Sequence, residues 1–196
     1  MPQYVKDGKK VFFIHIPKTG GSSLEKMFVD NGWEELEYGS IGKSQQHDRR
    51  YIWSQNVSED VEKITIIRNP VDRLLSEMRG APDYRERVNP WNANAVIDYF
   101  FQLINQGNFK AGHLSKIVEF VDPETMKDDN ITIYRFEDLE HRNKLTERFG
   151  FEGSYPHVVG GGYEPDLDYS LSEESIEKIL DYYKEDFEHF YPELLK

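Results

Sequence analysis

Three short apolar runs are spread along the chain, and each is followed by a pattern of helical spacing. The runs are residues 11–16 (VFFIHI), 64–67 (ITII) and 131–135 (ITIYR). Their β-branched and aromatic side chains are typical of strands that are buried on both faces. Strands that alternate with helices predict a parallel α/β sheet with crossover connections. With 196 residues, the chain is expected to form a single domain over residues 1–196.

Helix-start signals follow each of these runs. One helix is expected to begin at Gly21 and to end near Asn31, and a second to begin at Pro70, which is tolerated in a first helical turn. Apolar positions at helical spacing predict further helices over residues 95–104 and 136–150.

The last helix has the clearest pattern of all. Ser170 and Glu173 match a capping box, which predicts a helix start at this point. One stripe of apolar side chains follows, and core packing is its expected role: Ile176, Ile179, Leu180, Tyr183 and Phe187.

Charge and composition exclude several classes of protein. The formal net charge of −12, from 36 acidic and 24 basic side chains, argues against a nucleic-acid binder, because phosphate backbones require clustered Lys and Arg. The absence of cysteine excludes disulfides and thiolate chemistry. No run of about eighteen apolar residues predicts a membrane span, and the apolar run near the N-terminus is too short for a signal peptide. A soluble, cytoplasmic protein is therefore expected.

The loop after the first apolar run combines glycines, hydroxyl side chains and a lysine: Lys18, Thr19, Gly20, Gly21, Ser22 and Ser23. A turn between a strand and a helix presents free backbone amides at the positive end of the helix dipole, where phosphates bind. The glycines allow close approach of an anion, and the hydroxyls and the lysine can add charge-assisted hydrogen bonds. The sequence lacks the Gly-Lys-Ser/Thr ending of nucleoside triphosphatases. An ordinary turn whose glycines relieve strain is the alternative.

A second anion element has the same topology. The run at 64–67 delivers Arg68 to its carboxyl end, and Ser76 lies eight residues later on the following helix. Ligands of open α/β sheets collect at these strand ends. Surface arginines on a solvated helix are the alternative. Two anion elements, with no acidic strand end between them, predict a ligand that carries two phosphate-like groups and needs no metal ion.

These two segments resemble the signatures of a known enzyme family. FFIHIPKTGGSSL and ITIIRNPVDRLLS are similar to the paired motifs of sulfotransferases that use 3′-phosphoadenosine 5′-phosphosulfate (PAPS). The nearest group is the carbohydrate sulfotransferases with an IPKTGGTSL-type loop, which include glycan 2-O-sulfotransferases and shorter bacterial relatives. ITIYRFEDLE and YYKEDFEHFYPE resemble later parts of the family, so the resemblance covers most of the chain. A short bacterial-type or viral member is the expected kind.

The resemblance implies a fold and a set of binding residues. The implied fold is a P-loop-like, three-layer α/β/α arrangement with a small central parallel β-sheet flanked by helices. The loop from Lys18 to Ser23 would bind the 5′-phosphosulfate, with Lys18 near the sulfuryl group, while Arg68 and Ser76 would hold the 3′-phosphate. The product would be adenosine 3′,5′-bisphosphate, and no metal is expected. This is an activity of the EC 2.8.2 type.

Transfer to a hydroxyl also requires a base to accept its proton. His47 is the first candidate, because a histidine in this interval is the base in the resembling family; Asp48 could raise its basicity, and a loop histidine is the alternative. His113 is the second candidate and matches a recurring family position. His15, in the first strand next to the loop, is expected to have a supporting role in the core. The other three histidines are weaker candidates: His141, His157 and His189.

The acceptor is expected from the resemblance alone to be a saccharide hydroxyl, with a small alcohol or a lipid headgroup as alternatives. Six basic residues could line a cleft for an acidic glycan, or be scattered surface charge: Lys43, Arg49, Arg50, Arg79, Arg85 and Arg87. Two other functions stay open. One is a P-loop-like small-molecule kinase, and the other is a non-catalytic relative that binds the nucleotide only.

Overall fold

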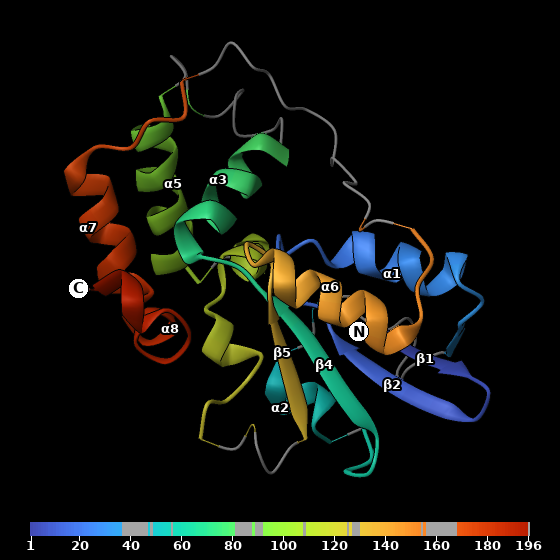
Figure 1. The fold of residues 1–196 in the computed structure, drawn as a ribbon. Helices are drawn as coiled ribbons and strands as arrows, with labels where there is room; N and C mark the ends of the chain where they lie inside the picture. Colours follow the sequence, from blue (N-terminus) through green and yellow to red (C-terminus); the bar gives the residue numbers. More distant parts are fainter. Residues whose placement is uncertain are drawn as a thin grey trace. The chain divides into compact units, whose positions relative to one another are not determined.

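The computed structural model describes residues 1–36, 47, 49–55, 57–80, 88, 92–107, 109–124, 126, 130–153, 155 and 168–195. Over these residues the protein is α/β, with one five-stranded sheet and seven α-helices (Figure 1). The chain forms two compact units: unit 1 is Met1–Arg68 with Ile117–Val158, and unit 2 is Asn69–Lys116 with Val159–Lys196. That these units form one domain stays a prediction.

Unit 1 contains the sheet. Its elements are β1 Gln3–Lys6, β2 Lys9–Ile14, α1 Gly21–Asp30, β3 Glu34–Leu36, α2 Arg50–Trp53, β4 Glu62–Ile67, η2 Ile117–Glu119, β5 Ile131–Arg135 and α6 Leu139–Phe149. The strand order is β3-β1-β2-β4-β5. The three predicted strands, β2, β4 and β5, are parallel to one another, as expected. The prediction of a wholly parallel sheet is wrong, because β1 pairs antiparallel with both β2 and β3 and makes the sheet mixed.

A tight hairpin adds the unpredicted strand β1 to the edge of β2. Asp7 and Gly8 connect the two strands with φ values of 50° and 79°. A two-residue turn with both φ values positive matches the twist of an antiparallel pair, and Asp-Gly is a favoured sequence for it. The antiparallel edge therefore has a local cause in the sequence.

Apolar side chains cover both faces of the sheet in unit 1. On one face, α1 and α6 pack against β2 and β4, with Leu24, Phe28 and Leu145 in the buried cluster. Phe28 stacks on Tyr4 of β1 with ring centroids 4.3 Å apart. On the other face, the buried ring of Trp53 lies 5.9 Å from that of Phe12. Side chains alternate between the two faces along a strand, so packing on both faces fixes the register of β2 and β4. The candidate loops begin where these two strands end.

Unit 2 is helical in its described part. Its elements are α3 Pro70–Gly80, α5 Ala93–Asn105, η1 Phe109–Leu114, α7 Glu173–Tyr182, α8 Lys184–Phe190 and η3 Pro192–Leu195. The predicted helix starts at Pro70 and near residue 95 are confirmed. Tyr183 closes the core by donating its hydroxyl proton to the Leu114 carbonyl at 2.6 Å.

The prediction for the last helix was wrong in three details, and the first is that the single predicted helix is two helices, α7 and α8, which are separated at Tyr183. Ser172, two residues after the predicted Ser170, caps α7 by accepting a hydrogen bond from the Ser175 amide. Ile176, predicted to face the core, is 37% exposed, whereas Ile179 is buried. The pattern therefore located the helix but not its first turn.

Within the described residues, no helix has both the length and the apolar character that a membrane crossing requires.

Candidate functional site

The loop between β2 and α1 leads into a helix N-terminus whose N-cap residue supplies no side-chain cap. Gly20 is the N-cap residue of α1, with φ of 85°, and it makes no side-chain capping bond. The first turn of α1 carries no acidic side chain. The positive end of the helix dipole is therefore not neutralised by the helix's own first turn. Lys18 has a φ of 64°, a conformation that is strained for a residue with a Cβ and often marks functional loops.

Both loop glycines are required by close neighbours. A Cβ on Gly20 would lie 2.6 Å from the ring of Phe136, which follows β5. A Cβ on Gly21 would overlap the imidazole of His15, at the end of β2. The loop backbone is thus held between two rings, one on each side, and neither glycine is present merely for flexibility.

The predicted hydroxyl donors have different environments. Thr19 is fully buried and donates its hydroxyl proton to the Ile16 carbonyl at 2.9 Å. A hydroxyl has one proton, so in this arrangement Thr19 braces the loop and can meet an anion only through its backbone amide. Ser22 is exposed at the helix end, while Ser23 is buried. Ser22 is the hydroxyl best exposed to a ligand.

His47 lies against the same loop. Its Nδ1 is 2.9 Å from the backbone carbonyl oxygen of His15. A carbonyl only accepts, so Nδ1 carries the proton and donates it, and the basic lone pair of the neutral ring is then on Nε2. The ring also meets the His15 ring edge to face, with centroids 4.6 Å apart. The predicted base candidate therefore has a defined tautomer beside the N-terminus of α1.

His15 is held by a carboxylate. Its Nδ1 lies 2.7 Å from Oε1 of Glu25 on α1, and its own side chain is only 4% exposed. The imidazole also stacks on Phe13, with centroids 5.2 Å apart. The expected supporting role of His15 thus has a physical form, which is a buried ring held between α1 and β2.

Two arginines meet the ring on the other side of the loop. The guanidinium carbon of Arg68 lies 4.8 Å from the centroid of Phe136, and that of Arg142, on α6, lies 5.7 Å from it. Among the described residues, Nε of Arg142 has no hydrogen-bond partner. The hydroxyl of Tyr155 donates to the Gly20 carbonyl at 2.9 Å; burial raises its pKa, and the positive charge of Arg142 opposes that rise. Sequence reasoning did not single out Arg142, because its spacing on α6 gives no such signal.

Unit 1 therefore brings the loop, His47 and Arg68 together through two rings, whereas Ser76 and His113 belong to unit 2. The pairing of Arg68 with Ser76 stays a prediction. Within unit 2, Nδ1 of His113 lies 3.2 Å from Oε2 of the buried Glu77, one residue after Ser76 on α3. The guanidinium of buried Arg73 donates to the Ser115 carbonyl at 2.8 Å, which ties η1 to α3.

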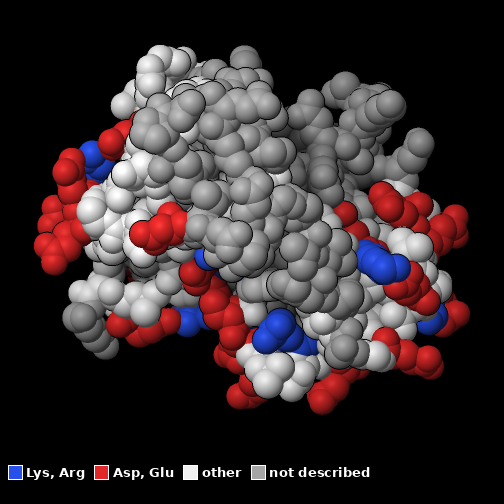
Figure 2. Space-filling view, turned by 90° about the horizontal axis from the view of Figure 1, so that it is seen from above, with Lys and Arg blue, Asp and Glu red and all other residues white. Residues whose placement is uncertain are grey.

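Of the six basic residues considered for an acidic glycan, the three that the structure describes all contact neighbouring side chains. Arg49 pairs with Glu119 at 3.0 Å, Arg50 lies 4.0 Å from Asp122, and Arg79 stacks over a tyrosine ring. The other three, Lys43, Arg85 and Arg87, lie outside the described residues, as do Asp48 and His157. Figure 2 shows acidic side chains spread over the described surface of one face, with basic ones set singly among them. This distribution fits scattered surface charge.

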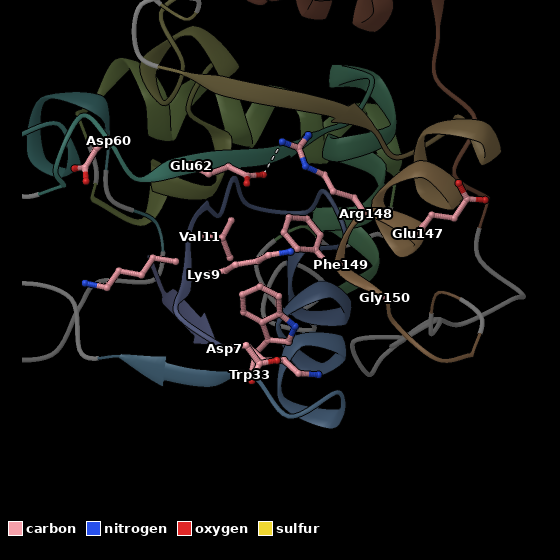
Figure 3. Close-up of a pocket in the computed structure, with 12 residues that line it drawn as sticks. Asp7, Lys9, Val11, Trp33, Asp60, Glu62, Glu147, Arg148, Phe149 and Gly150 are labelled. Carbon is pink, nitrogen blue, oxygen red and sulfur yellow. Dashed lines mark ion pairs between the residues drawn. The ribbon is translucent and has the colours of Figure 1, made fainter.

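A cavity of about 730 Å³ lies at the amino ends of β2 and β4, opposite to the strand ends that lead into the candidate loops (Figure 3). Lys9 and Trp33 line it, together with Phe149 at the end of α6. Its arginine, Arg148, is already paired with Glu62 at 2.7 Å. Loops that bind anions in such sheets lie at the carboxyl ends of the strands. This cavity is therefore separate from the candidate site.

Comparison with known proteins finds one family whose sequence profile matches the part of the chain that contains the loop. Residues 2–96 match the sequence profile of the sulfotransferase family, a span that contains Lys18 to Ser23, His47, Arg68 and Ser76 but not His113. No curated protein and no solved structure matches the chain significantly. The match over residues 2–96 supports a transferase and suggests transfer of a sulfuryl group.

Proposed function

We propose that the protein is a PAPS-dependent sulfotransferase that moves the sulfuryl group to a hydroxyl of an acceptor, with a carbohydrate as the leading class. Sulfotransferases generally use PAPS as the donor. The observation that carries the proposal is the uncapped start of α1, with Lys18 in a strained conformation in the loop before it. A helix N-terminus of this kind is a binding site for an oxyanion.

The residues of the loop have separate roles in this proposal. The amides at the start of α1 and the hydroxyl of Ser22 bind the 5′-phosphosulfate, and Lys18 supplies positive charge close to the sulfuryl oxygens. Thr19 holds the loop in shape through its bond to Ile16. Arg68 and Ser76 hold the 3′-phosphate. The residues thus supply an anion site at each end of the nucleotide.

His47 acts as the general base. The acceptor oxygen attacks the sulfur in line with the bridging oxygen of the phosphosulfate, a new S–O bond forms, and the bond to that bridging oxygen breaks. The acceptor proton passes to Nε2 of His47, and adenosine 3′,5′-bisphosphate leaves with the bridging oxygen. The hydrogen bond from Nδ1 to the His15 carbonyl favours the tautomer that this step needs. His113, held by Glu77, is the second candidate for contact with the acceptor.

A direct test is transfer from PAPS to a defined panel of acceptors. The panel contains neutral oligosaccharides, uronic-acid oligosaccharides, a simple alcohol and a lipid headgroup, and mass spectrometry detects the gain of one sulfate. ATP replaces PAPS in a parallel series, so that a kinase would be recognised by the gain of one phosphate. We expect sulfate transfer to a saccharide and no transfer from ATP. Binding of adenosine 3′,5′-bisphosphate without any transfer would instead identify a binding module.

Binding experiments test the two anion sites separately. Lys18→Ala and Arg68→Ala should each weaken binding of adenosine 3′,5′-bisphosphate in calorimetry, because each removes a charge-assisted contact. The matched control is Lys184→Ala, an exposed lysine on α8 whose ion pair is with Glu188. If neither substitution weakens binding relative to the control, the two-site assignment is wrong.

A further inference from the structure

The structure assigns a role to the buried His15 and to the partly exposed Glu25 that is bonded to it, two residues that the proposed chemistry does not use directly. We propose that Glu25 and His15 are positioning residues that hold His47 in its working orientation and link it to the phosphate loop. This inference rests on the proposed function only in taking His47 as the base. Neither Glu25 nor His15 is expected to touch the substrate.

His15 occupies a position where an apolar side chain would be expected. His15 continues an otherwise apolar run and is 3% exposed, and burial of a polar ring is unfavourable unless it is hydrogen-bonded. Glu25 satisfies the ring at 2.7 Å. A pair of this kind contributes little to stability compared with well-packed apolar side chains, whereas it fixes geometry strongly. The cost of burying the His15 ring is therefore best explained by the orientation that the bonded pair imposes.

His15 contacts His47 in two ways at once. Its backbone carbonyl accepts the Nδ1 proton of His47 at 2.9 Å, and its ring meets the His47 ring at an interplanar angle of 82°. A single hydrogen bond leaves an imidazole free to rock about that bond. The second, edge-to-face contact restricts this rotation, so Nε2 keeps one direction. Because Glu25 fixes the His15 ring, it acts on His47 through that ring.

The same ring also seats the start of α1. The His15 imidazole packs so closely on Gly21 that a Cβ there would overlap it. One side chain therefore contacts both the base and the helix end where the anion is proposed to bind. Small errors in the distance between these groups reduce rates strongly, since transfer requires an aligned geometry. The pair sets that distance without contacting either reactant.

The test uses two variants that keep a polar side chain at each position. His15→Asn removes the ring but retains an amide donor near the position of Nδ1, and Glu25→Gln retains the shape of the acceptor but removes its charge. The matched controls are His189→Asn and Glu177→Gln, which change exposed residues of unit 2. Thermal melting verifies that each variant is folded. If His15→Asn fails to fold, Glu25→Gln alone decides the test.

The first readout is independent of activity. Two-bond ¹H–¹⁵N correlation spectra report the tautomer of each of the six histidines, and the His47 signals are identified by their loss in His47→Gln. We expect the Nδ1-protonated tautomer of His47 in the intact protein, mixed tautomers in His15→Asn, and a smaller change of the same kind in Glu25→Gln. Unchanged His47 signals in folded His15→Asn and Glu25→Gln overturn the proposal, whether or not the protein transfers sulfate.

The second readout is kinetic and uses the saccharide of the panel that is sulfated best. His15→Asn should lower kcat by roughly tenfold, less than loss of the base itself, while the affinity for adenosine 3′,5′-bisphosphate is retained. In a His47→Ala background the same substitution should cause a clearly smaller loss of kcat, because the part of its effect that acts through His47 is already gone. An equal loss in both backgrounds shows an independent structural effect and overturns the proposal. Absence of transfer by the intact protein counts against the proposed function, and the spectra then still decide the role of the pair.

Discussion

Replacement of Gly20 by alanine tests two physical reasons why this position of the loop is a glycine. The first is conformational, because Gly20 has a φ of 85°, where a residue with a Cβ is disfavoured by about 1–2 kcal/mol. The second is steric, because the added Cβ would lie 2.6 Å from Cε2 of Phe136 and 3.6 Å from the hydroxyl oxygen of Tyr155. Arg68 and Arg142 both stack on the Phe136 ring, so the ring can yield only by disturbing them.

Gly32 provides a matched control in the same unit. It follows α1 with a φ of 75°, and a Cβ built there meets nothing within 4 Å. Gly32→Ala should therefore carry the conformational cost alone, about 1–2 kcal/mol. Gly20→Ala should add the cost of overpacking, about 1–3 kcal/mol more. The difference between the two variants isolates the contact with Phe136.

Urea unfolding gives the two free energies of unfolding, and calorimetry gives the affinity for adenosine 3′,5′-bisphosphate. We expect Gly20→Ala to lose more stability than Gly32→Ala and to bind the nucleotide more weakly, because movement of Phe136 displaces Arg68. Gly32→Ala should bind it as the intact protein does. Equal losses of stability in the two variants would refute the close approach, and intact nucleotide affinity in Gly20→Ala would refute the placement of the anion site at this loop.

Three further predictions concern single side chains. His47→Ala should lower kcat by about 10²- to 10⁴-fold in the sulfate-transfer assay while nucleotide affinity is retained, and near-normal turnover would remove it from the base role. Arg142→Gln should weaken nucleotide binding in calorimetry by roughly tenfold, with partial recovery in Arg142→Lys, because a guanidinium near the anion is lost; unchanged affinity would exclude this role. Trp53→Phe should lower the free energy of unfolding by about 1–3 kcal/mol, because the Phe120 carbonyl loses its 3.0 Å hydrogen bond, without an effect on nucleotide affinity.

Hydrophobic patterning predicted the elements that build the loop. β2 and β4 have near-continuous apolar runs because they lie inside the sheet and are largely buried, whereas the edge strand β5 has a shorter run in which only Tyr134 is buried. The start of α1 at Gly21 and the end of α6 at Gly150 were also correct. Sequence motifs and hydrophobic periodicity both describe short stretches of the chain, so they predict correctly those features that depend on neighbouring residues in the sequence.

The antiparallel edge was missed although its signal was present. Asp7-Gly8 lies between the polar and apolar alternation of QYVK and the run at 11–16, which is a strong pattern for a hairpin. The expectation of a parallel sheet took precedence over it. The misplaced cap at Ser170 has a different cause, because Ser170 and Ser172 both have a carboxylate or a serine three residues on, and only packing selects between them.

The contacts that assemble the site could not be predicted from the sequence. His15 is adjacent to the loop in the chain, but its bond to Glu25 depends on how α1 lies on β2, ten residues away. Arg142 is one of several charged residues on α6, and its position over Phe136 depends on the pairing of β5 with β4. Such contacts arise from tertiary packing, for which propensity and spacing give no information.

The strongly negative net charge is compatible with the proposed binding of a polyanionic nucleotide, because electrostatic interactions at the surface are short-ranged. At physiological ionic strength the screening length is about 8 Å, so acids scattered over the surface contribute little at the loop. Among the residues that the structure describes, the groups that matter at the loop are the amides at the start of α1, the positive charges of Lys18, Arg68 and Arg142, and the negative charge of Glu25. Glu25 has its carboxylate bonded to His15, on the strand side of the helix, and not in the first turn, where it would oppose an anion directly. In the proposed arrangement, this placement allows Glu25 to orient the base through His15 and to leave the helix end positive.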